Sequence, residues 1–163
     1  MAIHQYWGNV ELDWAGFSGE ITFNHPFFSE QGITIFLGEE FDEDGDEIEE
    51  APIENQLDAF AETYKSFITN FEAHLREMQI KAFERYQKLY ANYYENPEKS
   101  GEPALNIDSI EKHNEYIKEI MFLRVLNENA LKLSIRYQID TEHGLEFRFE
   151  NEQIVAVGGI AET

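Results

Sequence analysis

The sequence contains no cysteine. Disulfides, thiolate metal sites and cysteine nucleophiles are therefore excluded, and the composition suits a reducing cytoplasm. The chain also has no apolar run near the about 20 residues that a membrane helix needs. Its first residues lack the basic and apolar regions of a signal peptide. We therefore expect a cytoplasmic protein that does not bind membranes.

Basic residues are missing from the first part of the chain. Residues 1–64 contain no lysine or arginine but 16 aspartates and glutamates, and the formal net charge of the whole chain is -21. Such a charge repels nucleic acid and anionic membranes, and it attracts divalent cations or a basic protein. Solubility alone is the simpler explanation of the same composition.

Glycine and proline are absent from residues 53–94, which predicts a helical region over 53–95. Apolar residues recur there every three or four positions from Leu57 to Tyr93, which is typical of one helix face. At about 1.5 Å per residue, one straight helix would be longer than a domain is wide. We therefore predict a long amphipathic helix that is bent or broken near Thr69–Asn70. Its aromatic residues are expected in the core: Phe60, Phe67, Phe71, Phe83, Tyr86, Tyr90 and Tyr93.

Alternating apolar and polar residues predict strands on both sides of this region. In residues 1–38 the expected strands are 10–14, with Val10, Leu12 and Trp14 on one face, then 20–24 and 32–37, with a turn at Gly16–Gly19. In residues 118–158 the strands 120–126, 131–139, 145–150 and 153–157 are joined by links of hairpin length, which predicts an antiparallel meander.

A short helix is expected over 106–117, capped by Asn106 or Asp108. The 163 residues are long enough for one domain. The sequence therefore predicts a single α+β domain, in which a curved, mostly antiparallel sheet packs against the long helix and the short helix.

Residues 39–52 form an acidic loop or a hairpin that turns at Asp44–Gly45. An EF-hand does not fit, because no register places glycine at the sixth position and glutamate at the twelfth. No metal or cofactor site is predicted. We assign the carboxylates of this segment to partner binding: Glu39, Glu40, Asp42, Glu43, Asp44, Asp46, Glu47, Glu49 and Glu50.

Carboxylates and an imidazole are close together at Asp140, Glu142 and His143. Such groups can act as a general acid–base pair. The same residues suit a turn between two strands, because aspartate starts turns and Gly144 supplies a positive φ. The chain has no nucleotide-binding glycine motif, nucleophile elbow or zinc-protease motif. No catalytic residue is assigned, and these three are the only candidates.

A motif in residues 130–158 supports a family resemblance. Its residues are Asp140, Glu142, His143, Gly144, Leu145, Phe149, Val155 and Gly158. They resemble the D-x-E-H-G-L-x-x-x-F signature of a group of uncharacterised bacterial domains, in which a tryptophan often occupies the place of Ile139. The strand at Tyr6–Gly8 and the helix opening at Gln56 are also similar to that group.

The resemblance implies a cytoplasmic bacterial domain of unknown function. In size and acidity the group is similar to immunity proteins, which cap the active sites of toxins. The leading hypothesis is therefore a non-enzymatic, immunity-type domain whose partner is a basic protein. The alternatives are an enzyme that uses the Glu142–His143 turn, and a structural protein that forms a homodimer through the long helix.

Overall fold

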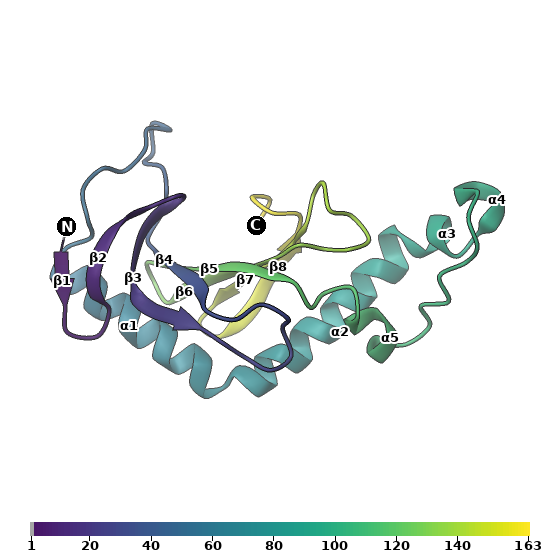
Figure 1. The fold of residues 1–163 in the computed structure, drawn as a ribbon, viewed down its shortest axis with the longest axis horizontal. Coiled ribbons are helices and arrows are strands. Elements are labelled where there is room, and N and C mark those ends of the chain that lie inside the picture. The colour runs from purple at the N-terminus through teal and green to yellow at the C-terminus, as the bar shows by residue number, and fades with distance from the viewer. Residues whose placement is uncertain (1) are drawn as a thin grey trace.

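The computed structural model describes residues 2–163 as an eight-stranded sheet with five helices (Figure 1). The strands are β1 (Ala2–His4), β2 (Gly8–Asp13), β3 (Gly16–Phe23), β4 (Ile33–Leu37), β5 (Ile120–Leu126), β6 (Ala130–Ile135), β7 (Leu145–Glu150) and β8 (Gln153–Gly158). The helices are α1 (Glu54–Thr69), α2 (Phe71–Leu89), α3 (Ala91–Tyr94), α4 (Pro97–Ser100) and α5 (Ile110–Asn114).

The strands lie in the sheet in the order in which they occur in the chain. Every neighbouring pair is antiparallel except β4 and β5, which are parallel because the helices connect them. The predicted mixture of helices with a mostly antiparallel sheet is therefore confirmed. The sheet is open, with β1 and β8 at opposite edges, and the predicted curvature is not confirmed.

The central strands follow the predicted pattern more closely than the first strands do. β5 has the predicted bounds, and its Leu123 and Val125 are fully buried. The turn between β2 and β3 lies at Trp14–Ala15 and not at Gly16–Gly19. Gly19 is needed inside β3, because a Cβ there would lie 2.5 Å from the backbone oxygen of Trp7.

Two predicted elements are shorter than expected. β6 ends at Ile135 because the chain then turns toward α5, where the Gln138 amide donates a hydrogen bond to the Tyr116 carbonyl (3.1 Å). α5 begins after Ser109, whose hydroxyl accepts a hydrogen bond from the Lys112 amide. Neither Asn106 nor Asp108 is therefore its cap.

The predicted long helix is two helices, α1 and α2, divided at Asn70 (φ −107°, ψ 19°). The break lies at the predicted position near Thr69–Asn70. Residues of the apolar stripe are buried from Leu57 to Tyr86, but Leu89 and Tyr93 are exposed. Tyr93 is therefore not a core residue, because the chain beyond Tyr86 extends past the sheet (Figure 1).

α1 and α2 run one after the other along one face of the sheet (Figure 1). α1 contacts β5 and β6, and α2 contacts β8. Phe67 of α1 meets Phe149 of β7 edge to face, with ring centroids 5.1 Å apart, and the Trp7 indole donates a hydrogen bond to the Leu57 carbonyl (3.0 Å). None of the helices in residues 2–163 has both the length and the apolarity that a membrane crossing requires.

Glu152 joins the sheet to the helix break. It lies in the β7–β8 turn, where Asn151 and Glu152 both have positive φ, as a type I′ hairpin requires. Its carboxylate accepts hydrogen bonds from the Ser66 hydroxyl and the Asn70 side-chain amide, both at 2.8 Å. These two bonds lower the pKa of Glu152. Glu152 therefore stabilises the break between α1 and α2.

We expect Glu152→Gln to lower the free energy of unfolding at pH 7 by about 1 kcal/mol, because the two bonds lose their charged acceptor. The lowered pKa means that this stabilisation is lost as the pH falls through the folded-state pKa, so the difference between wild type and variant should vanish in acid. Urea denaturation of wild type and variant, at pH 7 and at acidic pH, measures this difference in the free energy of unfolding. Glu128→Gln is the matched control, since Glu128 also has a positive φ in a hairpin turn and is exposed. If both variants lost the same free energy of unfolding, Glu152 would not stabilise the helix break in this way.

Candidate partner-binding surface

The acidic arm, residues 39–50, is an ordered hairpin-like excursion between β4 and α1. Phe41 and Glu47 form an isolated antiparallel bridge, and Gly45 has φ 85° at the tip. The Asp42 carboxylate accepts hydrogen bonds from the amides of Asp44 (2.9 Å) and Asp46 (3.0 Å). The turn therefore lies at the predicted place, and the arm projects from the sheet on the side opposite α1 and α2 (Figure 1).

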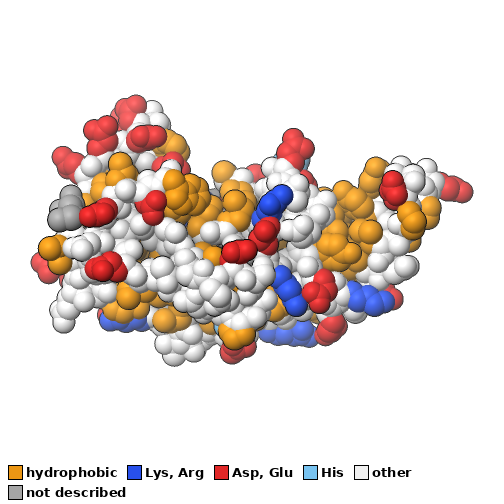
Figure 2. Space-filling model, viewed as in Figure 1, with side chains coloured by type: hydrophobic (Ala, Val, Ile, Leu, Met, Phe, Trp, Pro, Cys, Tyr) orange, Lys and Arg blue, Asp and Glu red, His pale blue; other side chains and the backbone are white. Residues whose placement is uncertain are grey.

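The carboxylates assigned to partner binding all lie on this arm. Eight of the nine are exposed, and Glu40 is half-buried. Within residues 2–163 no lysine, arginine or histidine forms an ion pair with any of them. Figure 2 shows acidic side chains crowded on the projecting arm, with hydrophobic side chains below them. The arm therefore presents a negative field that the chain itself does not neutralise.

Large apolar side chains are exposed beside the acidic arm. Leu12 is 60% exposed and Trp14 is 64% exposed, although the alternating pattern predicted that they share the face of Val10. Val10 is fully buried, so the buried stripe of β2 ends there. Trp14 lies in the β2–β3 turn, and its ring meets those of Phe36 and Phe122 edge to face on the sheet face without helices.

A hollow of about 80 Å³ joins these apolar residues to the acidic arm. Its lining combines apolar side chains with carboxylates: Leu12, Asp13, Trp14, Gly16, Glu40, Glu47 and Ile48. The hollow is smaller than the roughly 300 Å³ of typical small-molecule pockets. Its chemistry suits one side chain with an apolar stem and a cationic end, such as lysine or arginine.

Arg124 of β5 holds the two sides of this surface together. Its guanidinium donates hydrogen bonds to the carbonyl of Gly38, at the base of the arm (2.9 Å), and to the carbonyl of Ala15, beside Trp14 (2.7 Å). It also lies over the ring of Phe36, 4.8 Å from the centroid. Burial lowers the pKa of Arg124, and the nearby arm carboxylates partly offset this. Sequence analysis missed Arg124, because nothing local marks a strand arginine as buried.

The carboxylates in the part of the chain that the structure describes do not converge on a metal site. No group of three or more histidine, aspartate or glutamate side chains in residues 2–163 is arranged to hold a metal ion. On the arm, Asp42 is used to form the turn. The negative field of the arm is therefore spread over a surface.

The three candidate catalytic residues are only partly brought together. The Asp140 carboxylate lies 2.9 Å from His143 Nδ1 and accepts a hydrogen bond from the Tyr90 hydroxyl (2.8 Å). It also accepts a bond from the His143 amide, and Gly144 has φ 70°, as the turn interpretation predicts. Glu142 is exposed and has no hydrogen bond to either residue in the described part of the chain.

Asp140 and His143 form an ion pair when His143 is protonated, and the histidine is its exposed member. The hydrogen bond that its ring donates to the Asp140 carboxylate raises the pKa of His143, which is largely exposed. Burial raises the pKa of Asp140, but hydrogen bonds from Tyr90 and His143 outweigh that effect and lower it. The imidazolium can donate a proton, whereas the raised pKa leaves less of the neutral imidazole to act as a base near neutral pH.

Comparisons with known proteins give one family. Searches of curated proteins and of solved structures find no match to the chain. Residues 6–162 match a family model described as a domain of unknown function (DUF6985). The match spans nearly the whole sheet and all five helices, and the membership in such a family that the sequence predicted is confirmed. The chain therefore belongs to the DUF6985 family.

Proposed function

We propose that this domain binds a basic protein through the acidic arm and the adjoining Trp14 surface, in an immunity-type role that covers the partner's own functional site. The observation that carries the proposal is the hollow in which Trp14, Leu12 and Ile48 meet the carboxylates of Glu40 and Glu47. A lysine or arginine of the partner fits there, with its methylene groups on the apolar residues and its charge beside the carboxylates.

The two parts of the surface have different tasks in binding. The carboxylates of the arm attract a basic partner from a distance and accelerate encounter, an effect that salt weakens. Trp14 is the kind of residue that dominates interface energies, because a large aromatic ring loses much water-exposed area on binding. Its edge-to-face contacts with Phe36 and Phe122 fix the ring before the partner arrives.

Self-association through the helical region is less well supported. The apolar stripe of α1 and α2, from Leu57 to Tyr86, is already buried within the chain. Apart from the exposed Ile68 and Leu89, an interface on these helices would have to use their polar faces, which bind less strongly.

We expect two variants to weaken binding of the partner at least tenfold. Trp14→Ala removes the aromatic anchor, and the double variant Glu40→Gln/Glu47→Gln removes the charges at the hollow. The partner is first captured with the tagged chain from lysate of cells that express it, at low salt. The dissociation constants of the purified partner for wild type and variants are then measured by calorimetry at low and at high salt.

The matched control is Glu98→Gln/Glu111→Gln, which removes the same charge from exposed positions on α4 and α5. It should leave the affinity within about twofold of wild type. If the control weakens binding as much as Glu40→Gln/Glu47→Gln does, the attraction is that of net charge alone. Failure of wild type to retain any basic protein at low salt would also refute the proposal.

A further inference from the structure

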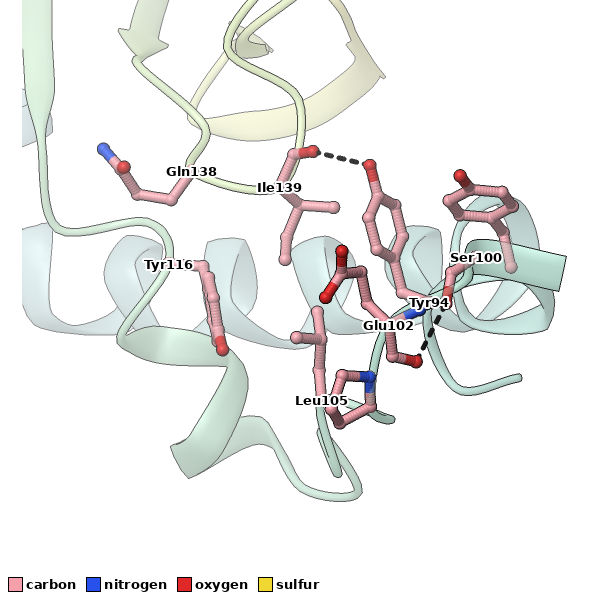
Figure 3. A pocket seen from close by; sticks show the side chains of 9 residues that line it. Tyr94, Ser100, Glu102, Leu105, Tyr116, Gln138 and Ile139 are labelled. Carbon is pink, nitrogen blue, oxygen red and sulfur yellow. Dashed lines mark hydrogen bonds between the residues drawn. The ribbon is translucent and has the colours of Figure 1, made fainter. Parts of the chain in front are cut away.

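A second hollow lies between α3, α4, α5 and the chain after β6 (Figure 3). In Figure 1 these helices lie at the end of the molecule far from β1. Its volume is about 350 Å³, which is within the range of small-molecule pockets. Its walls are three tyrosines with Pro103, Leu105 and Ile139, and its polar groups are Ser100, Glu102 and Gln138.

The aromatic walls form a corner. The rings of Tyr93 and Tyr94 have centroids 5.0 Å apart and are inclined at 84° to each other. The Tyr94 hydroxyl donates a hydrogen bond to the Ile139 carbonyl (3.1 Å), which fixes that ring. Tyr116 lies across the hollow from Tyr94 (Figure 3). Tyr93 and Leu105 are exposed, so the chain itself leaves this apolar surface uncovered.

The segment that closes the hollow is held in place. The Glu95 carboxylate accepts hydrogen bonds from the amides of Asn106 (2.8 Å) and Ile107 (3.1 Å) and from the Tyr86 hydroxyl (2.6 Å). The chain between α4 and α5 is therefore tied back to α2. A ligand would find the walls already formed, which reduces the ordering cost of binding.

The charge of the hollow selects the class of ligand. The Glu102 carboxylate points into the hollow (Figure 3), and no hydrogen bond or ion pair engages it within residues 2–163. No lysine, arginine or histidine lines the hollow, and the nearby Lys99 donates to Asn92 instead. Anions are repelled by Glu102 and by the net charge of -21.

We propose that this hollow binds a small quaternary ammonium compound with an apolar or aromatic body. The cation lies against the faces of Tyr93 and Tyr94 and beside Glu102, while the apolar body contacts Leu105, Pro103 and Ile139. Tyrosine faces attract cations through the ring quadrupole, and a quaternary ammonium is weakly hydrated, so it leaves water more easily than a lysine ammonium does. The proposal is independent of partner binding at the acidic arm.

The test compares a cation with its neutral isostere, meta-hydroxyphenyltrimethylammonium with meta-tert-butylphenol, by calorimetry and by NMR of the tyrosine rings. We expect the cation to bind wild type at least tenfold more tightly than the isostere and to shift the Tyr93 and Tyr94 signals. Glu102→Gln should weaken binding of the cation several-fold and leave the affinity for the isostere unchanged. Glu98→Gln, on α4 but outside the hollow, should change neither of these two affinities.

Three results would overturn the proposal. The first is equal affinity for the cation and the isostere, and the second is no binding of the cation at millimolar concentration. The third is an equal loss of affinity for the cation in Glu102→Gln and Glu98→Gln. That result would mean that the cation is attracted by the net negative charge and not by the hollow.

Discussion

Replacement of Arg124 by methionine is expected to lower the free energy of unfolding by about 3 kcal/mol. Methionine keeps the contact with Phe36 but leaves the buried carbonyls of Gly38 and Ala15 without their donor. A hydrogen bond to a charged group contributes about 1.5–3 kcal/mol, and two such bonds are lost. Urea denaturation at pH 7 measures this change. It should appear as a lower midpoint concentration of urea, with an unchanged dependence of the unfolding free energy on urea concentration.

The same substitution should loosen the binding surface. Arg124 connects the base of the acidic arm to the Trp14 turn, so amide hydrogen exchange in residues 39–50 should become faster in Arg124→Met. Arg136→Met is the control, because Arg136 is a largely exposed arginine just after β6 and should change stability by less than about 0.5 kcal/mol. Wild-type stability in Arg124→Met would show that the guanidinium does not hold this surface together.

Acid should destabilise the fold through His113. This side chain is fully buried beside Phe83 and Tyr86, and its Nε2 lies 2.6 Å from the Tyr137 hydroxyl. Burial lowers the pKa of His113 to about 4. The unfolded chain takes up the proton near pH 6.5, before the folded chain does, so stability is lost between about pH 6.5 and pH 4. The full loss is about 3 kcal/mol.

Two measurements separate His113 from the other groups. NMR titration should show its ring neutral down to about pH 4, whereas the ring of His143, whose pKa Asp140 raises, should titrate above 6.5. The double variant His113→Phe/Tyr137→Phe removes both hydrogen-bonding partners and should lose this part of the pH dependence. Titration of His113 near 6.5 would contradict its burial in a neutral form.

The parts of the fold that the sequence predicted are those that depend on local pattern. β5 has apolar residues at every position except Arg124, on both of its faces, so its bounds were clear. The length of the helical region predicted that it is bent or broken, although Glu152, which stabilises the break at Asn70, lies 82 residues away in the chain. Parallel pairing of β4 with β5 was not predicted, because it depends on where the helices return the chain.

The candidate surfaces were harder to predict for the same reason. The acidic arm was visible as a run of charges, but the exposure of Trp14 depends on where the buried stripe of β2 ends. Tyr93 fits the helical spacing of core residues, yet it lines a hollow because the chain beyond Tyr86 has no sheet to pack against. In both cases an aromatic residue in an apolar pattern is left uncovered by the tertiary arrangement.

The most direct test of the account is the footprint of the captured basic partner, measured by hydrogen–deuterium exchange of the chain alone and in the complex. We predict slower exchange in the acidic arm, residues 39–50, and in the β2–β3 turn that carries Trp14, with α2 and α3 unchanged. Protection confined to the helices or to the Asp140–Gly144 turn, with the acidic arm exchanging as in the free chain, would contradict the proposal that this surface binds the partner.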